Sequence, residues 1–147
     1  MIPAKDFDVF YCVDLDELVI EDFWRDLRQV VFDHPHYRRI YYQYAWSHDE
    51  ETGTPKWYFW YDKIHGPRGW RWEYPVHEAL RCRDCQKYGY QEDCYLSSDK
   101  IYLHHYPDLT KSRGSYLRLL ELRAKEYPDD LYGLYYLARE YDFKSEP

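Results

Sequence analysis

The segment Asp8-Val9-Phe10-Tyr11-Cys12-Val13-Asp14-Leu15-Asp16-Glu17 decides the fold that we expect for this chain of 147 residues. Its first half is a short, nearly continuous apolar run, which is typical of a strand covered on both faces of a sheet. Carboxylates follow at once, and open α/β sheets bind their ligands just beyond the carboxyl ends of their strands. The segment therefore predicts an α/β fold with an acidic site after an early strand.

The rest of the chain continues this pattern and then changes to helices. Residues 21–31 have helical spacing, and residues 49–55 form a polar turn. Strands are expected at 39–46, 56–64, 70–74 and 100–105, with a polar, cysteine-bearing loop over 81–94. Helical spacing returns at 112–126 and 131–141, on either side of Pro128-Asp129-Asp130. We therefore expect an α/β domain over residues 1–108 and a helical hairpin over residues 109–147.

The composition excludes several functional classes. The net charge is −7 and there is no stripe of lysine and arginine, which argues against nucleic-acid binding. The sequence also lacks an apolar stretch long enough to span a bilayer and an apolar signal segment at residues 1–6, so a cytoplasmic location is expected. Aromatic residues make up 21%, and they fill cores and sheets but also build surfaces that bind sugars.

Asp14 and Asp16 are the first candidate site. Two carboxylates at i and i+2 after a strand can hold a hard divalent cation through oxygen, and the alternative is a solvated loop that caps the next helix. His104 and His105 end the last expected strand, and one of them can add a ligand. Because adjacent strand residues point to opposite faces, at most one of the two is expected to reach a given site.

Two further groups can take part in chemistry. Glu78 follows an aromatic strand, where a raised pKa suits a general base, although a surface glutamate is the simpler interpretation. Lys63, His65 and Arg68 form a cationic cluster before a glycine turn. They can meet phosphate oxygens, or they can simply form an exposed hairpin tip.

The cysteines have part of the spacing of a zinc site. Cys82-x-x-Cys85 is followed by Cys94, and a histidine would have to supply the fourth ligand of a structural Zn²⁺. The alternative is a reduced loop that happens to contain cysteine. Cys12 lies in the first expected strand and is assigned to the core.

The order of these motifs resembles that of family-2 glycosyltransferases with the GT-A fold. The resemblance rests on residues 6–17, on Phe59-Trp-Tyr-Asp-Lys-Ile-His65, on Gly69-Trp-Arg-Trp72, and on Pro75-Val-His-Glu-Ala-Leu80. It continues through His104-His-Tyr-Pro-Asp108 and Lys111-Ser-Arg-Gly-Ser-Tyr-Leu117. Pro128-Asp-Asp130 and Tyr135-Tyr-Leu-Ala-Arg-Glu-Tyr141 are similar to the start of a tetratricopeptide-type tail.

The resemblance implies a partial GT-A, Rossmann-like mixed sheet followed by a helical hairpin, and a mechanism. A nucleotide-diphospho-sugar would bind with Mn²⁺ or Mg²⁺ at Asp14 and Asp16, with help from His104 or His105. A glycan or other hydroxyl acceptor would attack with inversion, and Glu78 would act as the base. The roles implied for the remaining residues are phosphate contacts for Lys63, His65 and Arg68, and sugar stacking for Trp70 and Trp72.

One departure from the family pattern shapes the expected partners. The half that holds the nucleotide base and ribose in such enzymes precedes the Asp-x-Asp strand, and this chain begins shortly before that strand. A homodimer or a partner chain that supplies this half is therefore expected, because an unprotected sheet edge also favours pairing. The rival hypothesis is a non-catalytic, zinc-stapled, aromatic-rich binding or scaffold domain.

Overall fold

The computed structural model describes residues 8–108, 110 and 114–145. They form two compact units with mixed α/β structure: residues 1–70 and 82–108 belong to the first, and residues 71–81 and 109–147 to the second. The first unit ends at residue 108. Residues 71–81, which we expected in the α/β domain, pack with the helices instead.

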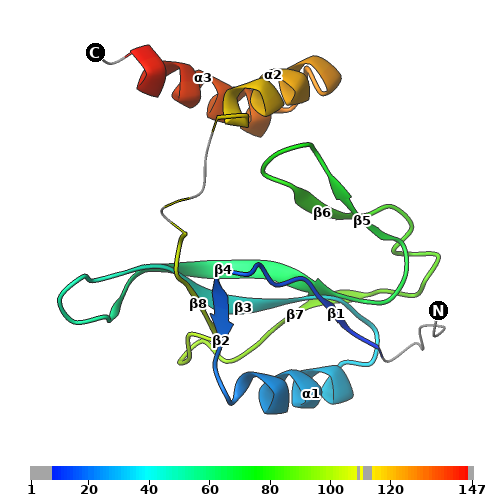
Figure 1. Cartoon of the computed structure of the whole chain (residues 1–147). Helices are drawn as coiled ribbons and strands as arrows, with labels where there is room; N and C mark the ends of the chain where they lie inside the picture. The colour runs from blue at the N-terminus through cyan, green and yellow to red at the C-terminus, as the bar shows by residue number, and fades with distance from the viewer. Residues whose placement is uncertain (1–7, 109, 111–113, 146–147) are drawn as a thin grey trace. The chain divides into compact units, whose positions relative to one another are not determined.

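A mixed sheet forms the body of the first unit (Figure 1). Its strand order is β1-β4-β3-β8-β2, and β7 pairs with the first part of β3. β4 runs antiparallel to β3, whereas β7 and β8 run parallel to it. The strands are β1 (Phe10–Tyr11), β2 (Glu17–Val19), β3 (Tyr37–His48), β4 (Pro55–His65), β7 (Glu92–Tyr95) and β8 (Leu103–His105).

The core of this unit lies between the sheet and α1 (Phe23–Asp33), which covers one face (Figure 1). Phe23 and Leu27 occur one turn apart on α1, so both reach the sheet. They meet buried side chains of the central strands, among them Ile40, Tyr42 and Leu103. This packing orders the strands whose ends carry the candidate site.

The first strand differs from the expectation. Only Phe10 and Tyr11 pair, and they pair with the antiparallel strand β4. Phe10 and Val13 are 45% and 48% exposed, so burial on both faces is a wrong prediction here. The reason is position: β1 lies at the edge of the sheet, where few neighbours can cover an apolar run.

The second unit contains most of a two-stranded sheet and the expected helical hairpin. The sheet pairs β5 (Trp70–Glu73) with β6 (Ala79–Cys82), and the helices are α2 (Tyr116–Glu126) and α3 (Leu131–Ser145). Arg123 of α2 is 3% exposed and donates to the carbonyl oxygens of Val76 and His77, at 2.8 and 2.9 Å. These bonds join the 71–81 hairpin to the helices.

Within the described residues, none of the helices is long and apolar enough to span a membrane.

Candidate functional site

A tight turn holds the acidic motif between β1 and β2. The Glu17 N–H donates to the Asp14 carbonyl oxygen at 3.2 Å, and the Asp14 N–H donates to Glu17 Oε2 at 2.8 Å. The Tyr106 N–H donates to the Asp16 carbonyl oxygen at 2.8 Å, which ties the turn to the end of β8. The turn sends the Asp14 and Asp16 side chains to different partners.

Asp14 is joined to Lys63 of β4. Lys63 Nζ donates to Asp14 Oδ2 at 2.6 Å and to Glu17 Oε1 at 3.1 Å. The side chains of Lys63 and Glu17 are 8% and 1% exposed, whereas that of Asp14 is 67% exposed. Burial lowers the pKa of Lys63, but its hydrogen bond to Asp14 and its electrostatic interactions with Tyr61 and Glu17 outweigh burial and raise that pKa overall. Lys63 is therefore a cation held between two carboxylates.

Asp16 lies next to His105 of β8, and Asp16 Oδ2 is 3.6 Å from His105 Nε2. His105 Nδ1 donates to the Trp46 carbonyl oxygen at 3.2 Å, so in the neutral ring Nε2 carries the lone pair. The ring also stacks on Trp46, with centroids 4.6 Å apart. A backbone hydrogen bond that fixes the tautomer and orientation of an imidazole is a common support of metal-binding histidines.

The donor set of this pair fits a divalent cation. Oxygen and nitrogen donors about 2.1 Å from a metal in neighbouring octahedral positions lie about 3.0 Å apart. The Asp16–His105 separation of 3.6 Å needs only a small side-chain rotation to reach that value. Asp14 would have to leave Lys63 to join them.

His104 faces the opposite way, as strand alternation requires. Its Nδ1 shares a hydrogen bond of 2.8 Å with His48 Nε2, and the two rings stack. Burial and then the neighbouring His48 lower the pKa of His104. His104 and His105 therefore belong to two different sets of contacts.

The three cations of the predicted cluster are spread out. His65 is buried, donates from Nδ1 to the Gly66 carbonyl oxygen at 2.7 Å, and has a pKa lowered by burial. Arg68 is exposed in the turn before β5, where its backbone N–H donates to Tyr90 Oη at 2.8 Å. Lys63 is engaged with carboxylates. A joint phosphate site of these three residues stays a prediction.

The predicted base and stacking residues lie in and around the β5–β6 hairpin. Glu78 and Trp72 are exposed and belong to the second unit. Trp70 belongs to the first unit, where its ring lies 5.3 Å from that of His65. Among the described atoms, Trp70 Nε1 is buried without a hydrogen-bond partner.

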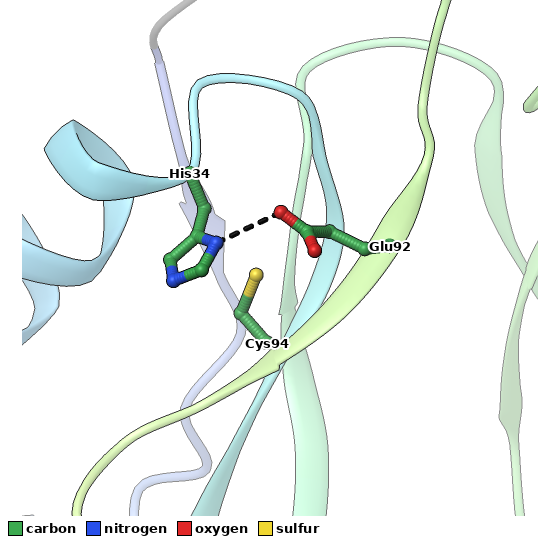
Figure 2. A group of neighbouring side chains, drawn as sticks. All are labelled: His34, Glu92 and Cys94. Atoms are coloured by element: carbon green, nitrogen blue, oxygen red, sulfur yellow. Dashed lines mark hydrogen bonds and ion pairs between the residues drawn. The ribbon is translucent and has the colours of Figure 1, made fainter.

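The cysteines divide into two places. Cys82 and Cys85 form a disulfide, whereas Cys94 is a buried thiol on β7 beside His34 and Glu92 (Figure 2). Sequence reasoning missed His34 and Glu92. Glu92 and Cys94 are two residues apart, which is the same-face spacing of a strand, but the sequence predicts a polar loop over residues 81–94, where that spacing does not indicate a shared face.

Comparisons with known proteins find no match: no family model, no curated protein and no solved structure is significantly similar to this chain.

Proposed function

We propose that this chain carries the metal- and acceptor-binding half of an inverting, metal-dependent glycosyltransferase of the GT-A type. The observation that carries the proposal is the Asp16–His105 pair, in which a carboxylate oxygen lies 3.6 Å from an imidazole nitrogen whose tautomer is fixed by Trp46. These two residues are 89 positions apart in the sequence, and the pairing of β2 with β8 brings them together.

The residues have distinct roles in this proposal. Asp16 and His105 hold Mn²⁺ or Mg²⁺, with Asp14 able to join them. The cation supplies charge neutralisation for the diphosphate leaving group. Lys63 keeps the acidic turn in place through Asp14 and Glu17, which supports a positioning role.

The transfer step needs one base. The acceptor hydroxyl oxygen attacks the anomeric carbon as the bond from that carbon to the diphosphate oxygen breaks, and the hydroxyl proton passes to a carboxylate base, the role that the resemblance implies for Glu78. The exposure of Glu78 supports this role, because a base must be open to the acceptor. Arg68 and His65 are proposed for phosphate contacts, and Trp70 and Trp72 for stacking on the sugar.

A binding domain without catalysis is the second candidate function. Four consecutive aromatic side chains of β4, Trp57 to Trp60, are exposed by 36% to 69%. Consecutive strand residues alternate between faces, so both faces of this part of the β3–β4 hairpin are aromatic. Such a surface suits a glycan or another flat, partly apolar ligand.

Titration calorimetry with UDP, GDP and dTDP, with and without Mn²⁺, tests the enzyme proposal. One nucleotide is expected to bind only when Mn²⁺ is present, and Asp16→Asn and His105→Gln are each expected to weaken that binding at least about tenfold. Asp33→Asn is the matched control, because Asp33 is exposed on α1 and bonds only locally to Gln29 in the contacts that we describe.

Two outcomes refute the assignment. Nucleotide binding that is the same without the metal would remove the basis of the Asp16–His105 site. Binding of glycans with no response to any nucleotide would favour the binding domain. If donor binding holds, Glu78→Gln should retain it and lose transfer, and unchanged turnover would contradict the role of Glu78 as the base.

A further inference from the structure

A second group of potential metal-binding side chains lies where the end of α1 meets the start of β7. His34 is the residue at the end of α1, and Glu92 and Cys94 occupy alternate positions of β7 (Figure 2). One ligand atom from each residue lies within 4.8 Å of the other two. In the described part of the chain, this is the group of three or more histidine, cysteine, aspartate or glutamate residues whose ligand atoms lie this close together.

The backbone holds both sides of this group. The His34 N–H donates to the Val30 carbonyl oxygen at 3.0 Å, and the Tyr37 N–H donates to the His34 carbonyl oxygen at 3.1 Å. Cys94 pairs in register with Ile40 of β3, and both are buried in the core. The triad is therefore built on ordered elements at every position, which is what a specific metal site requires.

The intervening residue belongs to a different set of contacts. Asp93 points to the other face of β7, where it bonds to Arg38 and Arg39 at distances from 2.6 to 3.5 Å. Arg38 and Arg39 are therefore paired with Asp93, and the Glu92 carboxylate lies beside His34 and Cys94.

The three donors together define the type of metal. Thiolate sulfur, imidazole nitrogen and carboxylate oxygen suit zinc, whereas Mg²⁺ and Ca²⁺ select oxygen ligands. Tetrahedral zinc with bonds of about 2.3 Å to sulfur and about 2.0 Å to nitrogen or oxygen places its ligand atoms about 3.3–3.6 Å apart. His34 Nδ1 and Glu92 Oε1 are now 2.8 Å apart in a hydrogen bond.

We propose that His34, Glu92 and Cys94 bind one Zn²⁺ ion, with a solvent molecule in the fourth position. The side chains of His34 and Glu92 are 44% and 52% exposed, so they can separate slightly to admit the ion, and solvent can reach it. Cys94 is 4% exposed and provides the fixed inner ligand.

Without a metal, the surroundings of Cys94 favour its protonated thiol. Burial, and then the charges of Glu92 and Asp93, raise the pKa of the Cys94 thiol to about 11. A bound dication reverses this effect, because it stabilises the thiolate and offsets the repulsion from Glu92. The site would join the end of α1 to β7 and would be independent of the Cys82–Cys85 pair.

Metal binding to the full chain tests the proposal. Protein that has been stripped with a chelator should take up one Zn²⁺, and its melting temperature should rise with zinc. Co²⁺ in place of zinc should give the absorption bands of tetrahedral coordination and a thiolate-to-metal charge-transfer band. His34→Gln and Glu92→Gln should each lower zinc affinity at least about tenfold, and Cys94→Ala should remove the charge-transfer band.

The controls separate this site from the other candidates. Cys82→Ser/Cys85→Ser should leave zinc binding unchanged. Circular dichroism checks that each variant is folded. His34→Gln and Glu92→Gln change partly exposed side chains, so these two variants still test the site if Cys94→Ala does not fold. Unchanged zinc affinity in both of these variants overturns the proposal, as does loss of zinc from the Cys82→Ser/Cys85→Ser protein.

Discussion

Replacement of Lys63 by methionine should strongly destabilise the first unit. The variant retains most of the side-chain volume but removes the cation that lies 3.1 Å from Glu17 Oε1. The Glu17 side chain is 1% exposed, so its carboxylate would remain buried without a compensating charge. Breaking such a pair by removing one partner costs about 3–5 kcal/mol, a large share of the roughly 5–15 kcal/mol by which a domain is stable.

The structure also predicts the order of the related variants. Glu17→Gln should cost about 1–3 kcal/mol, because Lys63 still has Asp14 as an ionic partner. Asp14→Asn should cost less than about 1 kcal/mol, because the Asp14 side chain is 67% exposed. Lys63→Met/Glu17→Gln should lose less than the sum of the single variants, because no uncompensated buried charge remains.

Urea unfolding followed by tryptophan fluorescence measures these differences. Of the six tryptophans, only Trp72 lies in the second unit, so the signal reports mainly on the first. A loss below about 1 kcal/mol in Lys63→Met, or equal losses in Lys63→Met and Asp14→Asn, would refute the reasoning that the Lys63–Glu17 pair is buried and coupled.

Three other predictions concern pH and the second unit. Burial lowers the pKa of His65 below 6.5 in the folded chain, so its contribution to stability is complete above that value and is lost as the pH falls and the unfolded chain gains a proton. The urea concentration at the midpoint of unfolding should therefore fall between about pH 7 and pH 5, and it should fall less in His65→Gln. Gly133→Ala should lower the melting temperature although alanine favours helices, because the new Cβ would lie 2.7 Å from Arg123 Nε and 2.8 Å from Asp130 Oδ2; a rise would contradict this contact. Arg123→Lys should lose its helical circular dichroism signal at a lower temperature than the control Lys125→Arg. The reason is that Arg123 bonds to Asp130 with two nitrogens, at 2.6 and 2.7 Å, and lysine cannot.

Local sequence signals predict the long elements well. The 3.6-residue spacing predicts α1, and Phe23 and Leu27 are buried as that spacing requires. The aromatic, β-rich segments around the polar turn predict the β3–β4 hairpin, which extends past its neighbours in Figure 1. These elements form because their own residues favour them, so their sequences are sufficient to predict them.

The short strands form for a different reason and were missed. β2, β6 and β7 contain three or four residues each, and β7 begins with Glu92 and Asp93, which disfavour strands. Their conformation comes from pairing with other strands: β7 pairs with the long strand β3, whereas β2 pairs with β8 and β6 with β5, which are themselves short. The pattern of apolar residues within a short strand does not indicate its pairing partner. The sequence also gives no sign that the 71–81 hairpin packs on Arg123, because an arginine is not an expected core residue.

The candidate site divides in the same way. The sequence indicates Asp14, Asp16 and the His104–His105 pair, since acidic residues after a strand are a local signal, but it leaves open which histidine takes part. It did not indicate which cation each carboxylate meets, because Lys63 and His105 arrive through strand pairing. His34 and Glu92 were missed because their juxtaposition with Cys94 depends on β7, which was expected to be a loop.

The separation of Asp14 from Asp16 has a consequence for the proposed metal site. Lys63 Nζ lies 2.6 Å from Asp14 Oδ2, so a divalent cation at Asp14 must displace or face an ammonium group, whereas Asp16 has a neutral imidazole at 3.6 Å when His105 is not protonated. Asp16→Asn should therefore weaken Mn²⁺ binding much more than Asp14→Asn, as measured by electron paramagnetic resonance of free Mn²⁺. Lys63→Met/Glu17→Gln in an Asp16→Asn background tests the cause. It removes the ammonium group without leaving the buried Glu17 carboxylate uncompensated, and some affinity should return through Asp14. Equal losses in the two aspartate variants, with no recovery on loss of Lys63, would mean that both carboxylates bind the metal directly and that the Lys63–Asp14 pair opens when the ion arrives.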